Sequence, residues 1–309
     1  MENKLVNEEE KQSQNENDVV AMAEPPEQTP ENKKKKKIII SVVIALVLII
    51  IISIILVFTI KIKRGENPPP DKSDTPDKSD TPDKSDTPEI EILPPLIYNS
   101  TSGNHTHTII FMPGYSNQPE DYINQFENKI KFSKKNDTTI VILRSPMRNI
   151  TCNNTQNYGW YDIITTPLRN FSCLDLDGLK KSAKVLETVI NNEVNLLNGD
   201  YGKIIIGGHS QGASITLYQA YTGKHLLGGI FAYSGFLPPG EVTKDKENLN
   251  AYLGFGDADQ VIEPAFINQT IDKIKNFKGF NLYIYKGHGH HVCTKQTIDA
   301  SNFLERIIK

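Results

Sequence analysis

The sequence contains few cysteines and no excess of positive charge. Three cysteines in 309 residues are too few to hold together a disulfide-rich scaffold. The 34 lysines and arginines are balanced by 37 aspartates and glutamates, which gives a formal net charge of −3. General nucleic-acid-binding proteins usually carry a basic excess, so we expect no nucleic-acid partner.

The N-terminal part consists of a segment with few core-forming residues, followed by a segment without charged residues. Residues 1–37 are dominated by Glu, Lys, Asn, Gln and Pro, so we expect a disordered cytoplasmic tail. Residues 38–60 carry no charge, and as a helix they would span roughly 34 Å, enough to cross a hydrocarbon core of about 30 Å. A cleaved signal peptide, the alternative, would have a shorter apolar core nearer the start of the chain. The segment therefore predicts a transmembrane signal anchor that contacts the membrane.

The residues around this segment predict its orientation. The five lysines 33–37 precede it and three basic residues follow it, which favours a cytoplasmic N-terminus. Seven N-x-S/T glycosylation sequons all follow it, at Asn99, Asn104, Asn136, Asn149, Asn153, Asn170 and Asn268. We therefore expect a single-pass membrane protein with a lumenal or extracellular C-terminal domain. A domain that faces the cytosol is the alternative.

Residues 61–95 form a stretch rich in Pro, Ser and Thr that contains three copies of Asp-Lys-Ser-Asp-Thr-Pro. A proline in every six-residue repeat suits neither a helix nor a strand, so the repeats predict a disordered, semi-extended stalk. This stalk would hold a domain formed by residues 96–309 away from the membrane.

Residues 96–309 alternate short apolar runs with amphipathic stretches. The runs rich in β-branched and aromatic residues predict strands at 108–112, 139–143, 203–206, 227–233, 251–255 and 281–285. The amphipathic stretches predict helices at 121–132, 179–197, 211–221, 264–276 and 297–308. This alternation predicts an α/β fold with a mostly parallel sheet and helices on both faces.

A G-x-S-x-G motif lies between a predicted strand and a predicted helix. It consists of Gly208, His209, Ser210, Gln211 and Gly212. A nucleophilic serine needs a sharp, strained turn to expose its hydroxyl, and the flanking glycines leave room for the adjacent strand and helix. Ser210 is the candidate nucleophile, and a glycine-rich turn without chemistry is the alternative.

A serine nucleophile needs a base and an acid that orients the base, and in this architecture they follow in the order Ser, Asp or Glu, His. Asp259 is the candidate acid because it lies in the loop after a predicted strand, and Asp257 is the alternative. The candidate bases follow the last predicted strand: His288, His290 and His291. A metal site is another interpretation of these histidines, but no partner at ligand spacing accompanies them, so we expect neither metal nor cofactor.

A tetrahedral intermediate needs backbone N–H donors directed at its oxygen. One donor is expected from Gln211, the residue after the nucleophile. The second is expected from the loop 113–117 after the first predicted strand, where Tyr115 is the candidate. An ordinary proline–glycine turn is the alternative for this loop.

The segment from about residue 108 to 308 resembles the acyl-protein thioesterase, or phospholipase/carboxylesterase, family of small α/β hydrolases. The resemblance is carried by the segments 207–212 (GGHSQG), 256–259 (GDAD), 285–290 (YKGHGH), 160–162 (WYD) and 234–238 (SGFLP). It implies an α/β-hydrolase fold and a Ser210–His290–Asp259 triad, with His290 selected over the other two histidines. The family's usual His-Gly-Leu-Gly-Asp loop is replaced here by Pro-Gly-Tyr-Ser-Asn.

The resemblance also sets the expected activity. Familiar members are cytosolic, whereas this chain is expected to be anchored and to face outward. We therefore expect a membrane-anchored serine hydrolase that cleaves lysophospholipids, lipid esters or short acyl esters or thioesters. The alternatives are a cytosol-facing acyl-protein thioesterase and a non-catalytic binding protein on the same fold. Oligomeric state is not indicated.

Three further residues carry expectations. Trp160, the one tryptophan, is a candidate for lining the acyl site, and plain packing is the alternative. Cys152 and Cys173 bracket the same region and could form a disulfide in an oxidising compartment.

Overall fold

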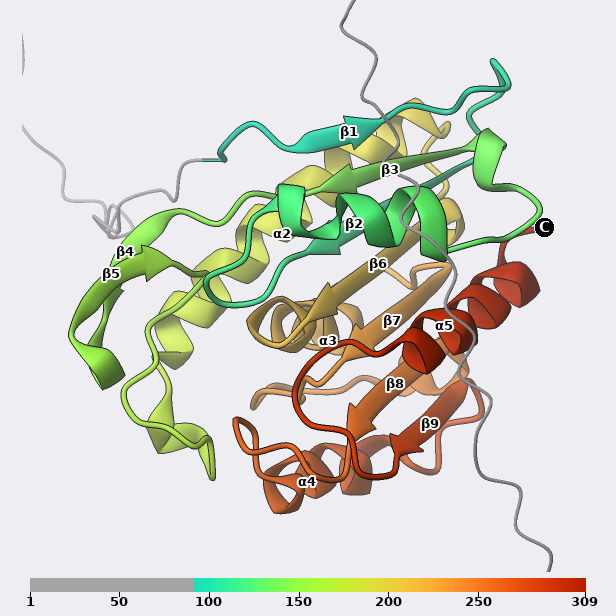
Figure 1. The fold of residues 1–309 in the computed structure, drawn as a ribbon. Coiled ribbons are helices and arrows are strands. Elements are labelled where there is room, and N and C mark those ends of the chain that lie inside the picture. Colours follow the sequence, from blue (N-terminus) through green and yellow to red (C-terminus); the bar gives the residue numbers. More distant parts are fainter. Residues whose placement is uncertain (1–91) are drawn as a thin grey trace, which may run out of the picture. The chain divides into compact units, whose positions relative to one another are not determined.

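Seven strands form the central sheet in the order β1-β3-β2-β6-β7-β8-β9 (Figure 1). The computed structural model describes residues 92–309, so the predicted tail, membrane anchor and most of the stalk lie outside the described residues. The strands are β1 (Leu96–Tyr98), β2 (His107–Met112), β3 (Thr138–Ile142), β6 (Ile204–His209), β7 (Gly229–Tyr233), β8 (Ala251–Gly256) and β9 (Phe280–Tyr285). All six predicted strands are confirmed.

The sheet is parallel except at one edge. β2 pairs in parallel with both β3 and β6, and the pairing continues in parallel through β7, β8 and β9. Only β1, a three-residue strand that the sequence did not predict, runs antiparallel to its neighbour β3. The mostly parallel sheet is thus confirmed. Because these strands run in the same direction, the loops after β2, β6, β8 and β9 all lie at the carboxyl ends of the strands.

Helices cover both faces of this sheet, as predicted. They are α2 (Leu176–Leu196), α3 (Gln211–Thr222), α4 (Pro264–Ile274) and α5 (Thr294–Ile307). α2, α3 and α4 pack on one face, and α5 packs on the other (Figure 1). Side chains alternate between the faces, since Ile110 belongs to the first core whereas Ile109 and Phe111 belong to the second. Strands buried on both sides read as continuous apolar runs, which is why the sequence showed them clearly.

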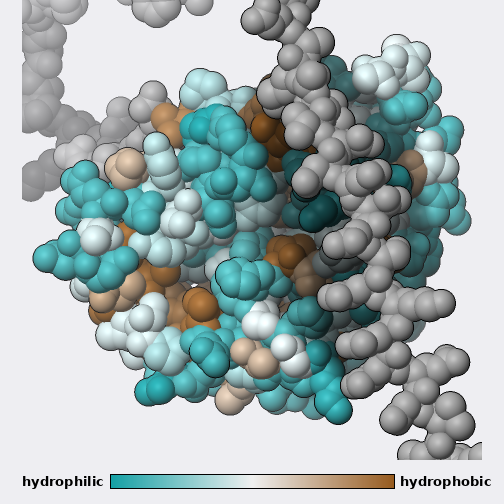
Figure 2. All heavy atoms as spheres, viewed as in Figure 1, coloured by the Kyte–Doolittle hydropathy of each residue, from teal (hydrophilic) through white to brown (hydrophobic). Residues whose placement is uncertain are grey.

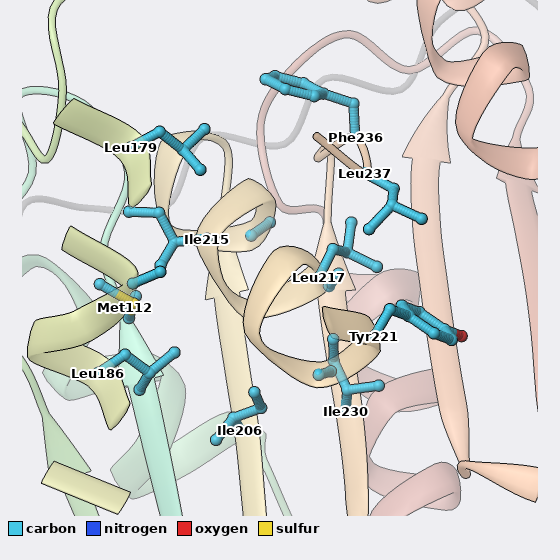
Figure 3. Close-up of a cluster of buried hydrophobic side chains, with 14 of the residues drawn as sticks. Met112, Leu179, Leu186, Ile206, Ile215, Leu217, Tyr221, Ile230, Phe236 and Leu237 are labelled. Atoms are coloured by element: carbon cyan, nitrogen blue, oxygen red, sulfur yellow. The ribbon is translucent and has the colours of Figure 1, made fainter. Parts of the chain in front are cut away.

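The larger core lies between the sheet and the first group of helices. Leu179 and Leu186 of α2 lie opposite Ile215 of α3 and Met112 of β2 (Figure 3). The Asp175 side chain caps the start of α2 by accepting a hydrogen bond from Gly178 N. The outer face shown in Figure 2 is mostly hydrophilic, with small separate hydrophobic patches. Apolar area is therefore concentrated at the sheet, which holds the strand ends in place.

The helix predicted at 121–132 is confirmed in part. Residues 119–129 are helical, but the segment is irregular and ends earlier than predicted: a 3-10 turn, η1 (Pro119–Tyr122), leads through two α-helical residues into a π turn, η2 (Gln125–Lys129). The Lys131 N–H donates a hydrogen bond to the Ser301 hydroxyl of α5 at 3.1 Å, and the Lys135 ammonium donates one to the Ile130 carbonyl at 3.0 Å. These two bonds, the first to a distant helix and the second local, replace the hydrogen bonds that would continue a helix.

A two-stranded hairpin and several short turns were not predicted. The hairpin pairs β4 (Met147–Ile150) with β5 (Thr155–Tyr158) in antiparallel register. Its strands are short and largely polar, so they lack the apolar signal on which strand prediction depends. The remaining 3-10 turns are η3 (Lys135–Asp137), η4 (Thr151–Asn153), η5 (Phe171–Cys173), η6 (Tyr201–Lys203) and η7 (Lys244–Asn248).

Candidate active site

Ser210 occupies the turn between β6 and α3. Its backbone has φ 53° and ψ −116°, a left-handed conformation that a serine adopts only where the surrounding structure enforces it. The Ser210 backbone N–H donates to the Tyr233 carbonyl on β7 at 2.9 Å, which fixes the turn to the sheet. Ser210 is 9% exposed, and it lines a cavity next to the turn.

The glycines on either side of Ser210 are required by close backbone approach. A Cβ on Gly208 would lie 2.5 Å from the backbone carbon of Gly212. A Cβ on Gly212 would lie 2.1 Å from the Met112 carbonyl oxygen at the end of β2. Any larger residue at either position would push the turn away from the sheet, so both glycines of the motif have a steric explanation.

Ser210, His290 and Asp259 form one line of hydrogen bonds. His290 Nε2 lies 2.8 Å from Ser210 Oγ, and His290 Nδ1 lies 2.8 Å from Asp259 Oδ2. Ser210 and His290 are 80 residues apart in the sequence. The parallel sheet brings the loops that carry the three residues together at the carboxyl ends of its strands. This is the geometry that a serine nucleophile, a general base and an orienting acid require.

The Asp259 carboxylate is held in its ionised form. Its other oxygen, Oδ1, accepts hydrogen bonds from Val261 N at 2.8 Å and Ile262 N at 3.0 Å. Burial raises the pKa of the Asp259 carboxyl, but the His290 contact and these two donors outweigh burial and hold the pKa below its usual value. The two backbone N–H groups thus hold Oδ1 in place and keep Oδ2 directed at His290 Nδ1.

The alternative acid and bases have other positions. Asp257 accepts a hydrogen bond from Gly287 N at 2.6 Å and so ties the acid loop to the base loop. His288 is exposed, and its carbonyl accepts from Ala258 N. His291 is exposed at the rim of the cavity. Within residues 92–309, no three His, Cys, Asp or Glu side chains are placed to hold a metal ion.

The loop 113–117 lies directly against the nucleophile. A Cβ on Gly114 would be 3.3 Å from Ser210 Cβ, and Tyr115 and Gln211 both line the cavity above the serine. In the part of the chain that the structure describes, neither the Tyr115 nor the Gln211 backbone N–H donates to a protein acceptor. Both N–H groups are thus available to a substrate oxygen, as an oxyanion site requires.

Trp160 lies behind this loop and does not line the cavity. It is 1% exposed, and its indole N–H donates to the Pro113 carbonyl at 2.8 Å. Its backbone N–H donates to the Gln211 side-chain oxygen at 2.9 Å, while the Gln211 amide donates to Tyr161 O at 2.8 Å. The prediction that Trp160 lines the acyl site is therefore corrected: its indole hydrogen-bonds to the loop 113–117. The neighbouring Tyr161 lines the cavity instead.

A cavity of about 290 Å³ opens above Ser210. Part of its lining is apolar and consists of Tyr161, Ile163, Leu168, Val261 and Ile262. The polar part of the lining includes Tyr115, Gln211 and His290. A site that combines an apolar wall with a few convergent polar groups suits a ligand with an apolar chain and one reactive polar bond.

His209 and Tyr122 connect the loops around the site, and sequence reasoning missed both. Tyr122 Oη lies 3.0 Å from His209 Nδ1, and His209 Nε2 lies 3.1 Å from the His290 carbonyl oxygen. Because a carbonyl only accepts, His209 carries its proton on Nε2 and accepts from Tyr122 at Nδ1. Burial, with a further contribution from the His290 imidazole, lowers the pKa of His209 to about 4, so the ring is neutral near pH 7.

The predicted disulfide is not formed. Cys152, Cys173 and Cys293 are all free thiols. Cys152 N donates to the Ile163 carbonyl, whereas the Cys173 carbonyl accepts from Ile164 N. The Ile163 carbonyl and the Ile164 N–H belong to one trans peptide and point in opposite directions. Cys152 and Cys173 therefore lie on opposite sides of that segment, with their Cα atoms about 10 Å apart, twice the spacing of neighbouring strands. A disulfide needs Cα atoms within about 7 Å.

The described domain matches a known family along nearly its whole length. The model of the phospholipase/carboxylesterase family matches residues 97–308. Acyl-protein thioesterase 1 of Debaryomyces hansenii is 28% identical over 230 residues, which cover 71% of this chain and 99% of that protein. Acyl-protein thioesterase 1 of Yarrowia lipolytica is 28% identical over 225 residues, 70% of this chain and 98% of that protein.

Solved structures show the same fold. Arabidopsis thaliana SOBER1 superimposes with a TM-score of 0.60 at 18% identity and covers 66% of this chain and 100% of its own. Esterase PE8 has a TM-score of 0.58 at 22% identity, with coverage of 71% and 100%. Zea mays acyl-protein thioesterase 2 has a TM-score of 0.55 at 18% identity, with coverage of 70% and 99%.

The comparisons correct the predicted localisation. The sequence predicted a single-pass membrane protein with a lumenal or extracellular catalytic domain, but the relatives are acyl-protein thioesterases, a cytosolic group, so that prediction is wrong. None of the helices within residues 92–309 has the length and apolar character needed to cross a membrane. The family match, the fold and the relatives agree along the domain, and this chain belongs to the phospholipase/carboxylesterase family of α/β hydrolases.

Proposed function

We propose that this protein is a serine hydrolase that cleaves acyl thioester and ester bonds, with acyl-protein thioesters as the favoured substrates. The observation that carries the proposal is the continuous line from Asp259 Oδ2 through His290 to Ser210 Oγ, with 2.8 Å at each step, beneath an apolar cavity. A non-catalytic binding protein would have no need for this alignment.

The acylation step follows from this geometry. His290 Nε2 takes the proton of the Ser210 hydroxyl as Oγ attacks the carbonyl carbon, and Asp259 stabilises the imidazolium that forms. The Tyr115 and Gln211 backbone N–H groups donate to the carbonyl oxygen as it becomes an oxyanion. His290 then returns the proton to the departing thiol or alcohol, which leaves the acyl group bonded to Ser210.

The deacylation step reverses the roles. His290 takes a proton from water, the hydroxide attacks the acyl-enzyme carbonyl, and the same two N–H groups hold the second oxyanion. Collapse of this intermediate breaks the bond to Ser210 Oγ, which regains its proton from His290. The products are a free carboxylic acid and the regenerated serine.

The substrate class is supported by the cavity and by the relatives. Ile163, Leu168, Val261 and Ile262 line the same cavity as Ser210 and offer an acyl chain an apolar surface. Relatives that match most of the domain are named acyl-protein thioesterases, which favours thioesters. The family description also includes phospholipases and carboxylesterases, so lysophospholipids and short esters form the second candidate class.

The test compares wild type with Ser210→Ala on a panel of substrates with one acyl chain: an activated ester, a lysophospholipid and an S-acyl peptide. We expect Ser210→Ala to abolish hydrolysis of all three and labelling by a fluorophosphonate. Ser133→Ala, an exposed serine away from the site, is the control and should behave as wild type. Undiminished turnover by Ser210→Ala would refute the proposal, and the wild-type ranking of the panel would decide between the substrate classes.

A further inference from the structure

A second, polar hollow lies beside the catalytic centre. It has a volume of about 240 Å³, and Val292 is the one aliphatic residue that lines it. Its other walls include Asn117, Asp121, Asn124, Gln125, Lys129 and His291. We call it the polar groove. Its composition contrasts with the acyl cavity, whose lining includes four aliphatic side chains and Tyr161.

The polar groove adjoins the acyl cavity at the reacting serine. Asn117, His209 and His291 line both hollows. His291 directly follows the base, and His209 directly precedes the nucleophile. Because Asn117 is partly exposed and His291 is exposed, they form a rim over which one substrate can extend from the acyl cavity into the polar groove.

The mechanism indicates what must lie on the groove side. His290 Nε2 protonates the leaving sulfur or oxygen, so the leaving group departs past the base and its neighbour His291. The acyl chain occupies the apolar cavity at that moment. A leaving group that extends over His291 therefore enters the polar groove, where side-chain amides, a carboxylate and an ammonium can form hydrogen bonds with it.

The groove chemistry favours a peptide over a lipid headgroup. Asn124 and Gln125 offer both donors and acceptors, and Asp121 and Lys129 add one charge of each sign, which suits the alternating N–H and C=O groups of a peptide. A choline headgroup is usually bound by an aromatic cage. Among the described residues that line the groove, Tyr122 is the one with a phenol ring, and it is only 5% exposed, so the groove offers no such cage.

We propose that the polar groove is the leaving-group subsite and that it binds the peptide segment that carries the acylated cysteine. This inference rests on the proposed function, since it assigns the second half of the same substrate. It distinguishes an enzyme that selects acylated peptides from one that accepts any acyl ester.

The test uses a matched pair of variants on the exposed turn that borders the groove. Asn124 and Asn128 are hydrogen-bonded to each other through their side chains at 3.0 Å, but only Asn124 lines the groove. Asn124→Trp breaks this bond and fills the groove, whereas Asn128→Trp breaks the same bond and leaves the groove open. Both variants are assayed in the full-length protein with an activated ester, a lysophosphatidylcholine and an S-acyl peptide that share one acyl chain.

We expect Asn124→Trp to lower kcat/KM for the S-acyl peptide at least about tenfold, since a bulky side chain blocks the groove, and to leave kcat/KM for the activated ester within about twofold. Asn128→Trp should leave both within about twofold. Equal losses on all substrates, or no loss on the peptide, would overturn the proposal. A loss confined to lysophosphatidylcholine would instead assign the groove to a headgroup.

A binding measurement separates this inference from the proposed function. The free thiol peptide, labelled with a fluorophore, is titrated with Ser210→Ala protein, which retains the groove. We expect saturable binding that Asn124→Trp abolishes and Asn128→Trp preserves. Peptide binding unaffected by Asn124→Trp, or no binding at all, counts against the groove even if the enzyme hydrolyses esters. Conversely, a wild-type protein that hydrolyses nothing would refute the proposed function alone.

Discussion

The Tyr122 hydroxyl lies 3.0 Å from His209 Nδ1, and through this contact the loops on the two sides of Ser210 are joined. Tyr122 Oη also accepts a hydrogen bond from Gly114 N at 3.2 Å, directly before the candidate oxyanion donor. His209 in turn reaches the His290 carbonyl. The position of the oxyanion loop is therefore coupled to that of the base loop through two buried side chains.

Tyr122→Phe should slow catalysis without greatly changing substrate binding. The variant removes the acceptor for Gly114 N–H and the donor to His209, so each loop loses a fixed reference to the other. A net hydrogen-bond loss of about 1–1.5 kcal/mol corresponds to a fall in kcat of about five- to tenfold, with KM nearly unchanged. Steady-state kinetics with an activated ester measure this effect.

The control for this prediction is Tyr201→Phe, which loses a surface hydrogen bond to Asn191 and should keep wild-type kinetics. Because Tyr122 and His209 form one network, Tyr122→Phe and His209→Gln should not be additive in a double-mutant cycle. Strict additivity of the two losses would show that the residues act separately.

Asp259→Asn and Asp257→Asn should differ widely in activity. Asp259→Asn leaves the shape of the site but presents an amide to His290 Nδ1, which disturbs the tautomer of the base, so kcat should fall about 10³- to 10⁴-fold. The Asp257 carboxylate accepts a hydrogen bond from the Gly287 backbone in the base loop, and its variant should lose less than about tenfold in kcat. Comparable losses in the two variants, measured by kcat, would contradict the assignment of Asp259 as the acid.

The buried His209 should make the fold less stable in mild acid. Its pKa is about 4 in the folded protein and about 6.5 when unfolded, so the unfolded chain binds the extra proton first as the pH falls. The stability linked to His209 is complete above pH 6.5 and declines toward pH 4, by up to about 3 kcal/mol.

Urea denaturation at several pH values between 7 and 4 measures this dependence. The free energy of unfolding of wild type should fall more steeply with acid than that of His209→Gln, which has no group that titrates at this position. Other groups titrate in both proteins, so the difference between the two curves isolates His209. Parallel curves would show that His209 does not carry the expected pH dependence.

All three cysteines should react as free thiols. The Ile163–Ile164 peptide lies between the backbones of Cys152 and Cys173, which keeps the two sulfurs apart. Mass spectrometry of denatured, alkylated protein that was purified without reductant should find three modified cysteines. Replacing Cys152 by Ser should accordingly leave the thermal midpoint within about 2 °C, because no cross-link is lost. A Cys152–Cys173 peptide in the digest would contradict this geometry.

Much of the fold could be predicted because its signals are local. β6 and β7 are buried on both faces and appear as continuous apolar runs, and α2 shows one apolar stripe along its length. The π turn at Gln125–Lys129 could not be predicted, because Ser301, 170 residues away from Lys131, supplies the acceptor that ends the helical pattern. The hairpin β4–β5 has polar strands, so only its pairing identifies it.

The amino-acid sequence by itself determined which residue types carry the chemistry: a serine between two glycines, an aspartate loop, a histidine loop and their order along the chain. It also determined the parallel sheet, since buried strands need apolar side chains on both faces. Only the tertiary structure decided that Trp160 braces a loop, that two cysteines stay apart and that Tyr122 and His209 link the site, because these outcomes depend on distances between segments far apart in the chain.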